Sequence, residues 1–373
     1  MNNTKTNSQH NITPPPRGIL QYQNQHAEFL QQIRGLCIIA VVLIHTVGAP
    51  SGTEESYLLI LTRGFINFPV AVFFFLSGFF NKSNGHYFGE EQGKFVSRIV
   101  RLWVPYIFWT TFYLCAGFLL CKITGTPFDL LRIPKAFLAG TASAPLYFLH
   151  VLLQLTIITP ILVKIIHSEA KFASLFKWGL IGITPLYIVA LYAYDFSAGK
   201  MLPLYNLPCF AWFTFYYLGL LCANGKISRD GLTGLPTATI LAFAALFIAI
   251  WEGFLIYGQV GTEIFSLAIS QIRFGSVLFS LTVINLVLCL KRTNPPKNKF
   301  FSELGDYSFG IYAFHMFWMA PLAFSCSRMI FFPEILPLIK IMQGGVCVGV
   351  TFLACKVTEK IIGKKLSKLI GIR

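Results

Sequence analysis

Residues 31–50, "QQIRGLCIIAVVLIHTVGAP", combine a long apolar run with two ionisable side chains, Arg34 and His45. The run has the length of a helix that crosses a bilayer, for which about 20 apolar residues suffice. A charged side chain at the centre of such a helix costs at least about 2.5 kcal/mol on insertion scales. A membrane helix that keeps both residues therefore predicts a function for them.

The whole 373-residue chain has the composition of a polytopic membrane protein. Hydrophobic residues make up 55% of it and charged residues 12%, and the mean hydropathy is +0.64. A soluble domain has too little interior to bury so much apolar surface. The formal net charge of +15 would suggest nucleic acid for a soluble protein, but the cytoplasmic loops of membrane proteins collect Lys and Arg. We therefore expect contact with membrane lipid and no nucleic-acid partner.

Ten apolar runs have roughly the length of transmembrane helices, about 17 to 25 residues. Their approximate bounds are 33–51, 58–80, 101–121, 145–166, 178–194, 206–223, 234–257, 264–290, 306–324 and 335–355. With the N-terminus in the cytoplasm, most of the 30 lysine and arginine residues fall on the cytoplasmic side. We expect an all-α, polytopic integral membrane protein with about ten transmembrane helices and both termini in the cytoplasm.

The two ends of the chain differ from its apolar centre. Residues 1–28 are polar and contain a proline run, which is typical of a mobile tail and unlike a signal peptide. Residues 358–373 are basic and partly amphipathic, so they either lie along the inner leaflet or only anchor the topology. The segment between them, 29–357, is expected to form one transmembrane domain.

The cysteines and histidines do not form a metal-binding pattern. The nine cysteines are scattered mostly inside apolar runs and include no C-x-x-C pair, so we interpret them as small buried hydrophobic residues. No carboxylate or thiolate accompanies the histidines of the spans at ligand spacing. We expect no metal ion.

Arg34 and His45 share one face of the first helix. Eleven steps of about 100° end within about 20° of three full turns, and the rise of about 1.5 Å per residue separates the two residues by about 16 Å. Arg34 would then lie near the cytoplasmic boundary and His45 near the bilayer centre. A cation at the entrance suits phosphate, and an imidazole at depth suits proton transfer. Alternatively, Arg34 only extends to the inner interface and His45 makes one structural hydrogen bond.

Several motifs resemble those of the membrane acyltransferase-3 family, which includes the O-acetyltransferases of bacterial surface polysaccharides. They are R-x10-H on the first span, "FPVAVFFFLSGFF" on the second, "KFVSRIVRLWVPYIFW" at the entry to the third, "PLYFLHVLLQLTIITPIL" on the fourth and "LGDYSFGIYAFHMF" on the ninth. Their order and topology make the resemblance specific, and it covers nearly the whole chain.

The resemblance implies an integral-membrane O-acyltransferase of the bacterial cytoplasmic (inner) membrane. Such an enzyme moves an acyl group, usually acetyl, from cytoplasmic acyl-CoA to a sugar hydroxyl of a cell-surface or lipid-linked polysaccharide, such as the O-antigen of lipopolysaccharide. Many relatives also carry an extracytoplasmic hydrolase-like domain. We expect none here, so the chain either completes the transfer itself or hands the acyl group to an accessory partner. A homo-oligomer is a further possibility.

The family residues tied to activity map onto this chain one by one. The Arg and His of the first span correspond to Arg34 and His45, the Ser-Gly of the second span to Ser77 and Gly78, and a basic residue before the third span to Arg98 or Arg101.

These matches suggest a role for each residue. His45 is the expected catalytic base, with a covalent acyl-histidine as the alternative. Arg34 would polarise the thioester carbonyl or bind the CoA phosphates together with Arg98 and Arg101. Ser77 would position a substrate, or would only allow close helix packing.

Three ionisable residues in later spans are further candidates. Arg273, about a third of the way into the eighth span, is expected to bind the acceptor from the outer half, with a structural pair to Glu252 as the alternative. His315 is a weaker candidate for substrate binding, because a lone histidine on an apolar helix is more often a packing residue. We expect the packing role for His150.

Two other classes of protein fit the same composition. A secondary transporter or exporter of a glycan or glycolipid also has ten to twelve spans with buried charges, and a membrane scaffold or sensor needs no active site. A transporter predicts similarly broken helices in two related halves. Pro69 and Pro105 fall in or near early spans, but no matching segments follow later.

Overall fold

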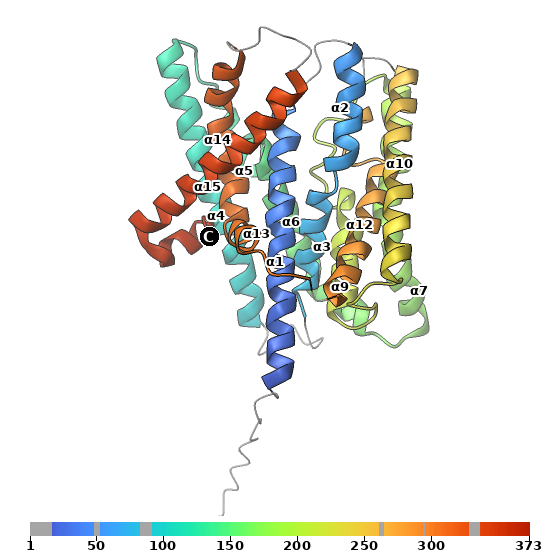
Figure 1. Cartoon of the computed structure of the whole chain (residues 1–373). Coiled ribbons are helices and arrows are strands. Elements are labelled where there is room, and N and C mark those ends of the chain that lie inside the picture. The colour runs from blue at the N-terminus through green and yellow to red at the C-terminus, as the bar shows by residue number, and fades with distance from the viewer. Residues whose placement is uncertain (1–16, 48–52, 83–91, 261–264, 294, 328–335) are drawn as a thin grey trace, which may run out of the picture.

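The computed structural model describes residues 17–47, 53–82, 92–260, 265–293, 295–327 and 336–373. These residues form helices and no β-strand, which confirms the all-α class. Helix α1 (Arg17–Thr46) runs through the centre of the bundle (Figure 1). The other helices are α2 (Thr53–Ile66), α3 (Pro69–Phe79), α4 (Gln92–Thr124), α5 (Arg132–Ala139), α6 (Tyr147–His167), α7 (Lys171–Gly179), α8 (Ile183–Ala198), α9 (Phe213–Ala223), α10 (Leu235–Val260), α11 (Phe265–Ala268), α12 (Phe274–Arg292), α13 (Lys299–Asp306), α14 (Ser308–Ser327) and α15 (Leu336–Leu369).

Eight helical segments of the described residues are long and apolar enough to cross a membrane. They correspond to eight of the predicted spans. Of the other two, 206–223 is α-helical only over the short α9, and 306–324 corresponds to α14. The chain is therefore a multi-pass membrane protein, whereas the count of ten spans and the side of the termini stay predictions.

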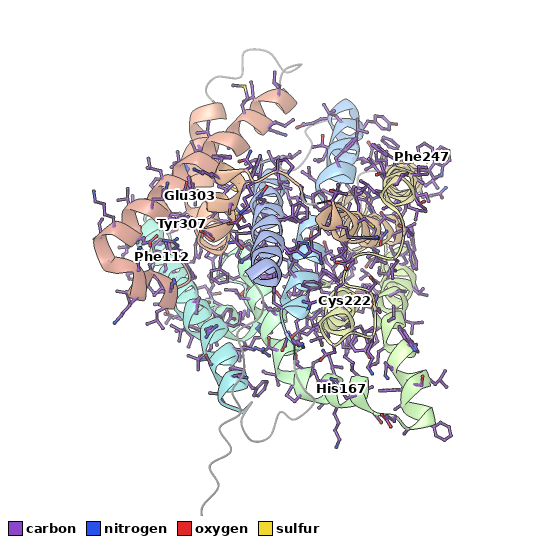
Figure 2. The ribbon with its side chains drawn as sticks, turned by 60° about the horizontal axis from the view of Figure 1, so that its bottom comes forward. Phe112, His167, Cys222, Phe247, Glu303 and Tyr307 are labelled. Atoms are coloured by element: carbon purple, nitrogen blue, oxygen red, sulfur yellow. The ribbon has the colours of Figure 1, made fainter. Side chains whose placement is uncertain are left out.

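The outer surface of the bundle is apolar, as contact with lipid requires. Phe247 of α10 lies at the edge of the bundle (Figure 2) and is 67% exposed. Cys222 of α9 lies inside (Figure 2) and is 2% exposed. Large exposed hydrophobic side chains recur along α4, α8, α10 and α15. In water such a surface would cause aggregation, but in a bilayer it faces the lipid chains.

Both predicted tails are partly helical. Helix α1 begins at Arg17, so it includes the end of the predicted polar tail 1–28, of which 1–16 lie outside the described residues. The predicted basic tail 358–373 continues α15, which kinks at Gly363 (φ 80°). The chain then folds back against the bundle, where Ile372 is 2% exposed and the indole Nε1 of Trp109 donates to the carbonyl of Ile370 at 3.0 Å.

The predicted second span is broken between α2 and α3. Pro69 occupies the first turn of α3, where its missing N–H costs nothing, but it cannot donate a hydrogen bond back into α2. Asn67 lies at the break and is 1% exposed. Its side-chain amide donates to the carbonyls of Ile269 and Ser270, both at 3.1 Å.

The predicted eighth span, 264–290, is broken as well, so its expected continuous helix is wrong. A non-helical segment separates α11 from α12, and the Ser270 hydroxyl accepts a hydrogen bond from the Ile272 N–H at 3.0 Å. Non-helical backbone at membrane depth needs polar partners from the protein. The Asn67 amide supplies two of them, so the two breaks stabilise each other.

Glycines allow α3 and α9 to pack against each other almost backbone to backbone. A Cβ on Gly78 would lie 2.1 Å from the carbonyl oxygen of Tyr216, and one on Gly219 would lie 2.2 Å from that of Phe75. Small residues serve this purpose in membrane helices. The same device joins α1 to α13, because a Cβ on Gly35 would lie 2.2 Å from the carbonyl oxygen of Phe301.

Candidate active site

Helix α1 carries both Arg34 and His45, and each side chain lines a cavity on the same side of the helix. This is the shared face that eleven helical steps predict. The position of His45 along its helix differs from the prediction. Because α1 ends at Thr46, His45 lies in the last turn and not in the middle of a helix over 33–51. The end of the helix leaves its last carbonyls open to side chains from other helices.

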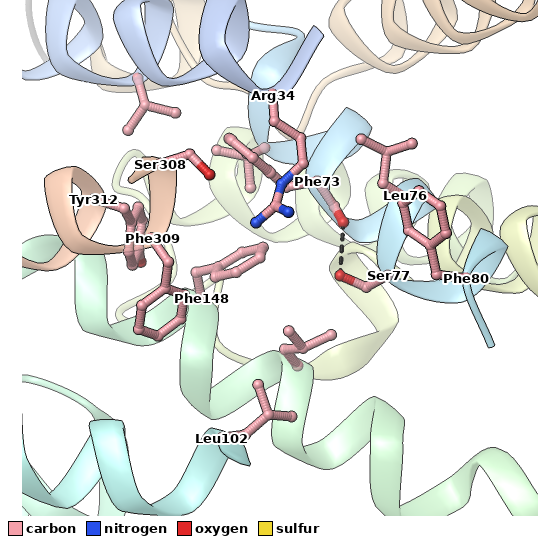
Figure 3. Close-up of a pocket in the computed structure, with 13 residues that line it drawn as sticks. Arg34, Phe73, Leu76, Ser77, Phe80, Leu102, Phe148, Ser308, Phe309 and Tyr312 are labelled. Carbon is pink, nitrogen blue, oxygen red and sulfur yellow. Dashed lines mark hydrogen bonds between the residues drawn. The ribbon is translucent and has the colours of Figure 1, made fainter. Parts of the chain in front are cut away.

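The first cavity, here called the Arg34 cavity, has a volume of about 250 Å³. Figure 3 shows the Arg34 guanidinium pointing into the space between Phe148, Ser77 and Ser308. Aromatic and aliphatic side chains form most of the wall. Its lining consists of Arg34, Val41, Val70, Phe73, Leu76, Ser77, Phe80, Leu102, Phe148, Leu152, Ser308, Phe309 and Tyr312.

The guanidinium of Arg34 is linked to a carboxylate only through another side chain. Its Nη1 donates to Oε1 of Gln31 at 3.3 Å, and Nε2 of Gln31 donates to the Asp306 carboxylate at 2.8 Å. Gln31 thus bridges the arginine and the acid. The Ser308 hydroxyl, which also lines the cavity, has no hydrogen-bond partner among the described residues. The cavity therefore offers a cation and a hydroxyl to a polar or anionic group.

The Ser-Gly pair of the second-span motif faces a cavity with one residue and a neighbouring helix with the other. The Ser77 hydroxyl donates to the Phe73 carbonyl one turn earlier at 2.8 Å, a bond also drawn in Figure 3. Its side chain lines the Arg34 cavity, while the neighbouring Gly78 makes the close contact with α9.

A second cavity, here called the Arg98 cavity, adjoins the first. It has a volume of about 320 Å³ and is lined by both Arg98 and Arg101. Ser77, Phe80, Leu102 and Leu152 line both cavities. Arg98 also donates to the side chain of Asn81. The motif leaves open which of the two arginines faces the site, and in the structure both do.

The third cavity, here called the His45 cavity, adjoins the Arg34 cavity on the other side. Its volume is about 200 Å³, and Val41, Val70 and Tyr312 line both cavities. Its wall is richer in polar groups. The lining consists of Val41, Ile44, His45, Arg63, Val70, Ala144, Pro145, Tyr147, Tyr205, Asn206, Trp212, Gln271, Ile272 and Tyr312. The three cavities thus adjoin one another in a row that runs from Arg98 past Arg34 to His45.

His315 lies directly beside His45. The centroids of the two rings are 5.3 Å apart, and their planes are tilted by 44°. His315 is fully buried, and its Nδ1 lies 2.8 Å from the carbonyl oxygen of Tyr312. An N–H at Nδ1 satisfies that carbonyl, so the other ring nitrogen, Nε2, is the acceptor in the neutral ring. Nε2 has no hydrogen-bond partner among the described residues.

Arg273 does not lie inside a helix as predicted, because it is the extended residue that precedes α12. It is fully buried, its Nε lies 3.9 Å from Oε2 of Glu252, and it lines none of the three cavities. Glu252 also accepts hydrogen bonds from the Tyr192 hydroxyl and the Gly275 N–H, both at 2.8 Å. This is the arrangement of the structural alternative, in which the carboxylate ties α8, α10 and α12 together.

His150 lies outside the three cavities, with its ring 6.1 Å from that of Tyr106. Arg63, in contrast, lines the His45 cavity, and the sequence patterns did not single it out. The signal was present, because Arg63 interrupts the apolar run "LLILTRGFI" as Arg34 interrupts its own. Tyr205 lies just before the predicted sixth span and Asn206 is its first residue, and nothing marks either one in the sequence.

Comparison with known proteins agrees with the motifs. No curated protein and no solved structure matches the chain. A family model described as an acyltransferase domain matches residues 28–358, which is nearly the whole chain. This match confirms the resemblance that the R-x10-H motif and its companions indicate, and it makes the protein an acyltransferase. The chain belongs to the membrane acyltransferase-3 family.

Proposed function

We propose that the protein transfers an acetyl group from cytoplasmic acetyl-CoA to a sugar hydroxyl of a lipid-linked or cell-surface polysaccharide in the bacterial inner membrane. The observation that carries the proposal is the row of adjoining cavities, with Arg98 and Arg101 at one end and His45 at the other. A donor with a phosphorylated head and a thioester at the end of a long flexible arm matches that order of groups.

The donor would enter from the side of the Arg98 cavity. Arg98 and Arg101 supply positive charge for the CoA phosphates, and guanidinium groups suit phosphate because they can donate in pairs. The pantetheine arm would follow the largely apolar Arg34 cavity, where Arg34, Ser77 and Ser308 can bind its amide groups. The acetyl end would then pass Tyr312 and reach the His45 cavity.

The acceptor sugar would occupy the His45 cavity. Tyr147, Tyr205 and Trp212 provide aromatic faces, and Asn206 and Gln271 provide amides that can bind hydroxyl groups. The Gln271 Oε1 is buried without a hydrogen-bond partner among the described residues. A sugar hydroxyl would satisfy it. A wall with few convergent polar groups among aromatic ones is typical of small-molecule sites.

His45 would act as the general base. A base must lie within hydrogen-bond reach of the proton that it removes, and a neutral imidazole has one ring nitrogen that can accept it. The unpaired Nε2 of His315 lies next to the His45 ring and is a candidate partner for it or for the substrate. Direct transfer and a covalent acyl-histidine are both compatible with this placement.

The decisive experiment compares the purified wild type with His45→Ala in nanodiscs. We expect wild type to release CoA thiol from acetyl-CoA faster when extracted envelope glycolipid is added. His45→Ala should lower this rate by about 10² to 10⁴, the usual contribution of a general base. His150→Ala is the matched control, because this histidine lies outside the cavities. Thermal unfolding establishes that all three proteins are folded.

A folded wild type that releases no thiol with a full set of acyl donors and glycan acceptors would contradict the proposal. A variant at His45 that keeps the full rate would contradict only the assignment of the base.

A further inference from the structure

We propose that Arg63 is a catalytic residue that donates a hydrogen bond to the oxyanion formed on the acetyl carbonyl beside His45. This inference rests on the proposed acyltransferase function and assigns a role that the family motifs gave to no residue near His45. Three observations carry it: where Arg34 lies, how Arg63 is held, and which charges surround Arg63.

Arg34 cannot serve the carbonyl at His45. The two residues are about 16 Å apart along α1, whereas an oxyanion donor lies about 3 Å from its oxygen. Side chains of a helix lean toward its N-terminus, and the bond from Arg34 to Gln31 fixes the guanidinium over the preceding turn, away from His45. The two residues also line different cavities. The stabilising donor at His45 must therefore come from another element.

Arg63 of α2 lines the same cavity as His45, and two hydrogen bonds fix its guanidinium there. Its Nη1 donates to the carbonyl of Ile44, the residue before His45, at 3.0 Å, and its Nε donates to Oδ1 of Asn67 at 2.9 Å. Asn67 is fixed in turn by its two bonds to the broken backbone before α12. A donor that is already oriented needs no reorganisation when charge develops, which is the source of most electrostatic catalysis.

The remaining guanidinium nitrogen is available to a substrate. Two of the three nitrogens of Arg63 are engaged, and Nη2 makes no hydrogen bond to any described residue. Within the described part of the chain Arg63 forms no ion pair with an Asp or Glu, although its side chain lines the cavity. A cation kept without a counter-charge at membrane depth is costly unless a negative charge arrives during function.

The reaction then balances as follows. The acceptor hydroxyl oxygen attacks the acetyl carbonyl carbon and gives its proton to His45, while the carbonyl oxygen becomes an oxyanion opposite Nη2 of Arg63. When the oxyanion collapses, the carbon–sulfur bond breaks. The leaving sulfur takes the proton from the imidazolium, so the products are the acetyl ester and the free CoA thiol, and His45 and Arg63 return to their starting states.

The test measures turnover and donor binding separately for Arg63→Gln, Arg63→Lys and wild type in nanodiscs. Loss of one oxyanion donor lowers kcat by about 10² to 10³. We expect that loss for Arg63→Gln, with the dissociation constant for CoA within about twofold of wild type, because the CoA phosphates lie two cavities away. Arg63→Lys should recover part of kcat. Arg132→Gln, an exposed arginine of α5, is the matched control.

Chemical rescue excludes a merely structural effect. Millimolar guanidinium added to Arg63→Ala should restore part of kcat, and it should not rescue His45→Ala. Three results would overturn the inference while leaving the proposed function standing: full kcat in Arg63→Gln with an active wild type, weaker CoA binding at unchanged kcat, or no rescue of a folded Arg63→Ala. An inactive, folded wild type would instead contradict the proposed function itself.

Discussion

Arg34 and Arg63 are both arginines in apolar helices, but their different hydrogen bonds predict different tasks. Arg34 bonds to Gln31 on its own helix and leads to Asp306, so it lies at the end of the site that faces the arginines of the Arg98 cavity. Arg63 bonds to the backbone beside His45. The two should therefore show opposite kinetic signatures.

Arg34→Gln is expected to weaken donor binding and not the chemical step. Loss of a charge-assisted hydrogen bond of about 1.5 to 3 kcal/mol corresponds to roughly a 10- to 100-fold rise in the KM for acetyl-CoA. The kcat at saturating donor should stay within about threefold of wild type, since the interaction is equally strong in the ground state and the transition state. Steady-state thiol release over a range of acetyl-CoA concentrations measures both constants. A fall in kcat at unchanged KM would show that Arg34 acts on the carbonyl.

Among individual residues, the sequence identifies at least one side chain of each cavity but not the residues that surround His45. Arg34 and His45 can be linked because eleven residues of one helix have a known geometry. Arg63, Asn206 and Tyr312 line the His45 cavity from three other segments, and no rule of spacing brings those segments together. His315 lies beside His45 although the two residues are far apart in sequence, and only packing could reveal this contact.

The helices themselves follow from apolar runs, but the breaks in them depend on distant partners. Pro69 marks one break in the sequence. The break before α12 has no such mark, and the carbonyls of Ile269 and Ser270 are satisfied by Asn67, about 200 positions earlier. A run of apolar residues predicts a continuous helix wherever such a long-range partner is not known. For this reason the run predicts Arg273 inside a helix, although it precedes the helix.

The close contact between α3 and α9 predicts that Gly78 tolerates no side chain. In Gly78→Ala the new Cβ would lie 2.1 Å from a backbone oxygen, so the two helices must move apart. Overpacking of this kind costs about 1 to 3 kcal/mol, and we expect a lower Tm in detergent together with lower activity, because Ser77 of the same helix lines two cavities.

Gly117→Ala is the control for Gly78→Ala. Gly117 lies inside α4, and apart from its chain neighbours and its own helix backbone no atom of the described residues lies within 4 Å of the position that an added Cβ would take. Alanine there should therefore leave the Tm unchanged or raise it, because alanine favours a helix more than glycine does. Equal Tm values for the two variants would contradict the tight α3–α9 contact.

For the molecule as a whole, the charge pattern makes a prediction about topology that labelling can test. With ten spans and a cytoplasmic N-terminus, Lys200 after α8 faces outward and Lys226 after α9 faces the cytoplasm. Both side chains are exposed. In intact spheroplasts a membrane-impermeant maleimide should label Lys200→Cys, and it should label Lys226→Cys only after lysis. The unsubstituted chain gives the background from Cys115 and the other native cysteines. The reverse pattern would invert the proposed entry side of the donor.

The amino-acid sequence is sufficient to identify an all-helical membrane protein of the acyltransferase-3 family and to place Arg34 and His45 on one face. These conclusions rest on composition, on the length of apolar runs and on motifs, which are local properties of the chain. They suffice because each membrane helix must form its backbone hydrogen bonds within itself. Tertiary packing was needed to establish which residues surround His45, that Arg273 lies beside Glu252, and that Arg63 donates to Asn67. Those facts depend on contacts between segments far apart in sequence, where local rules carry no information.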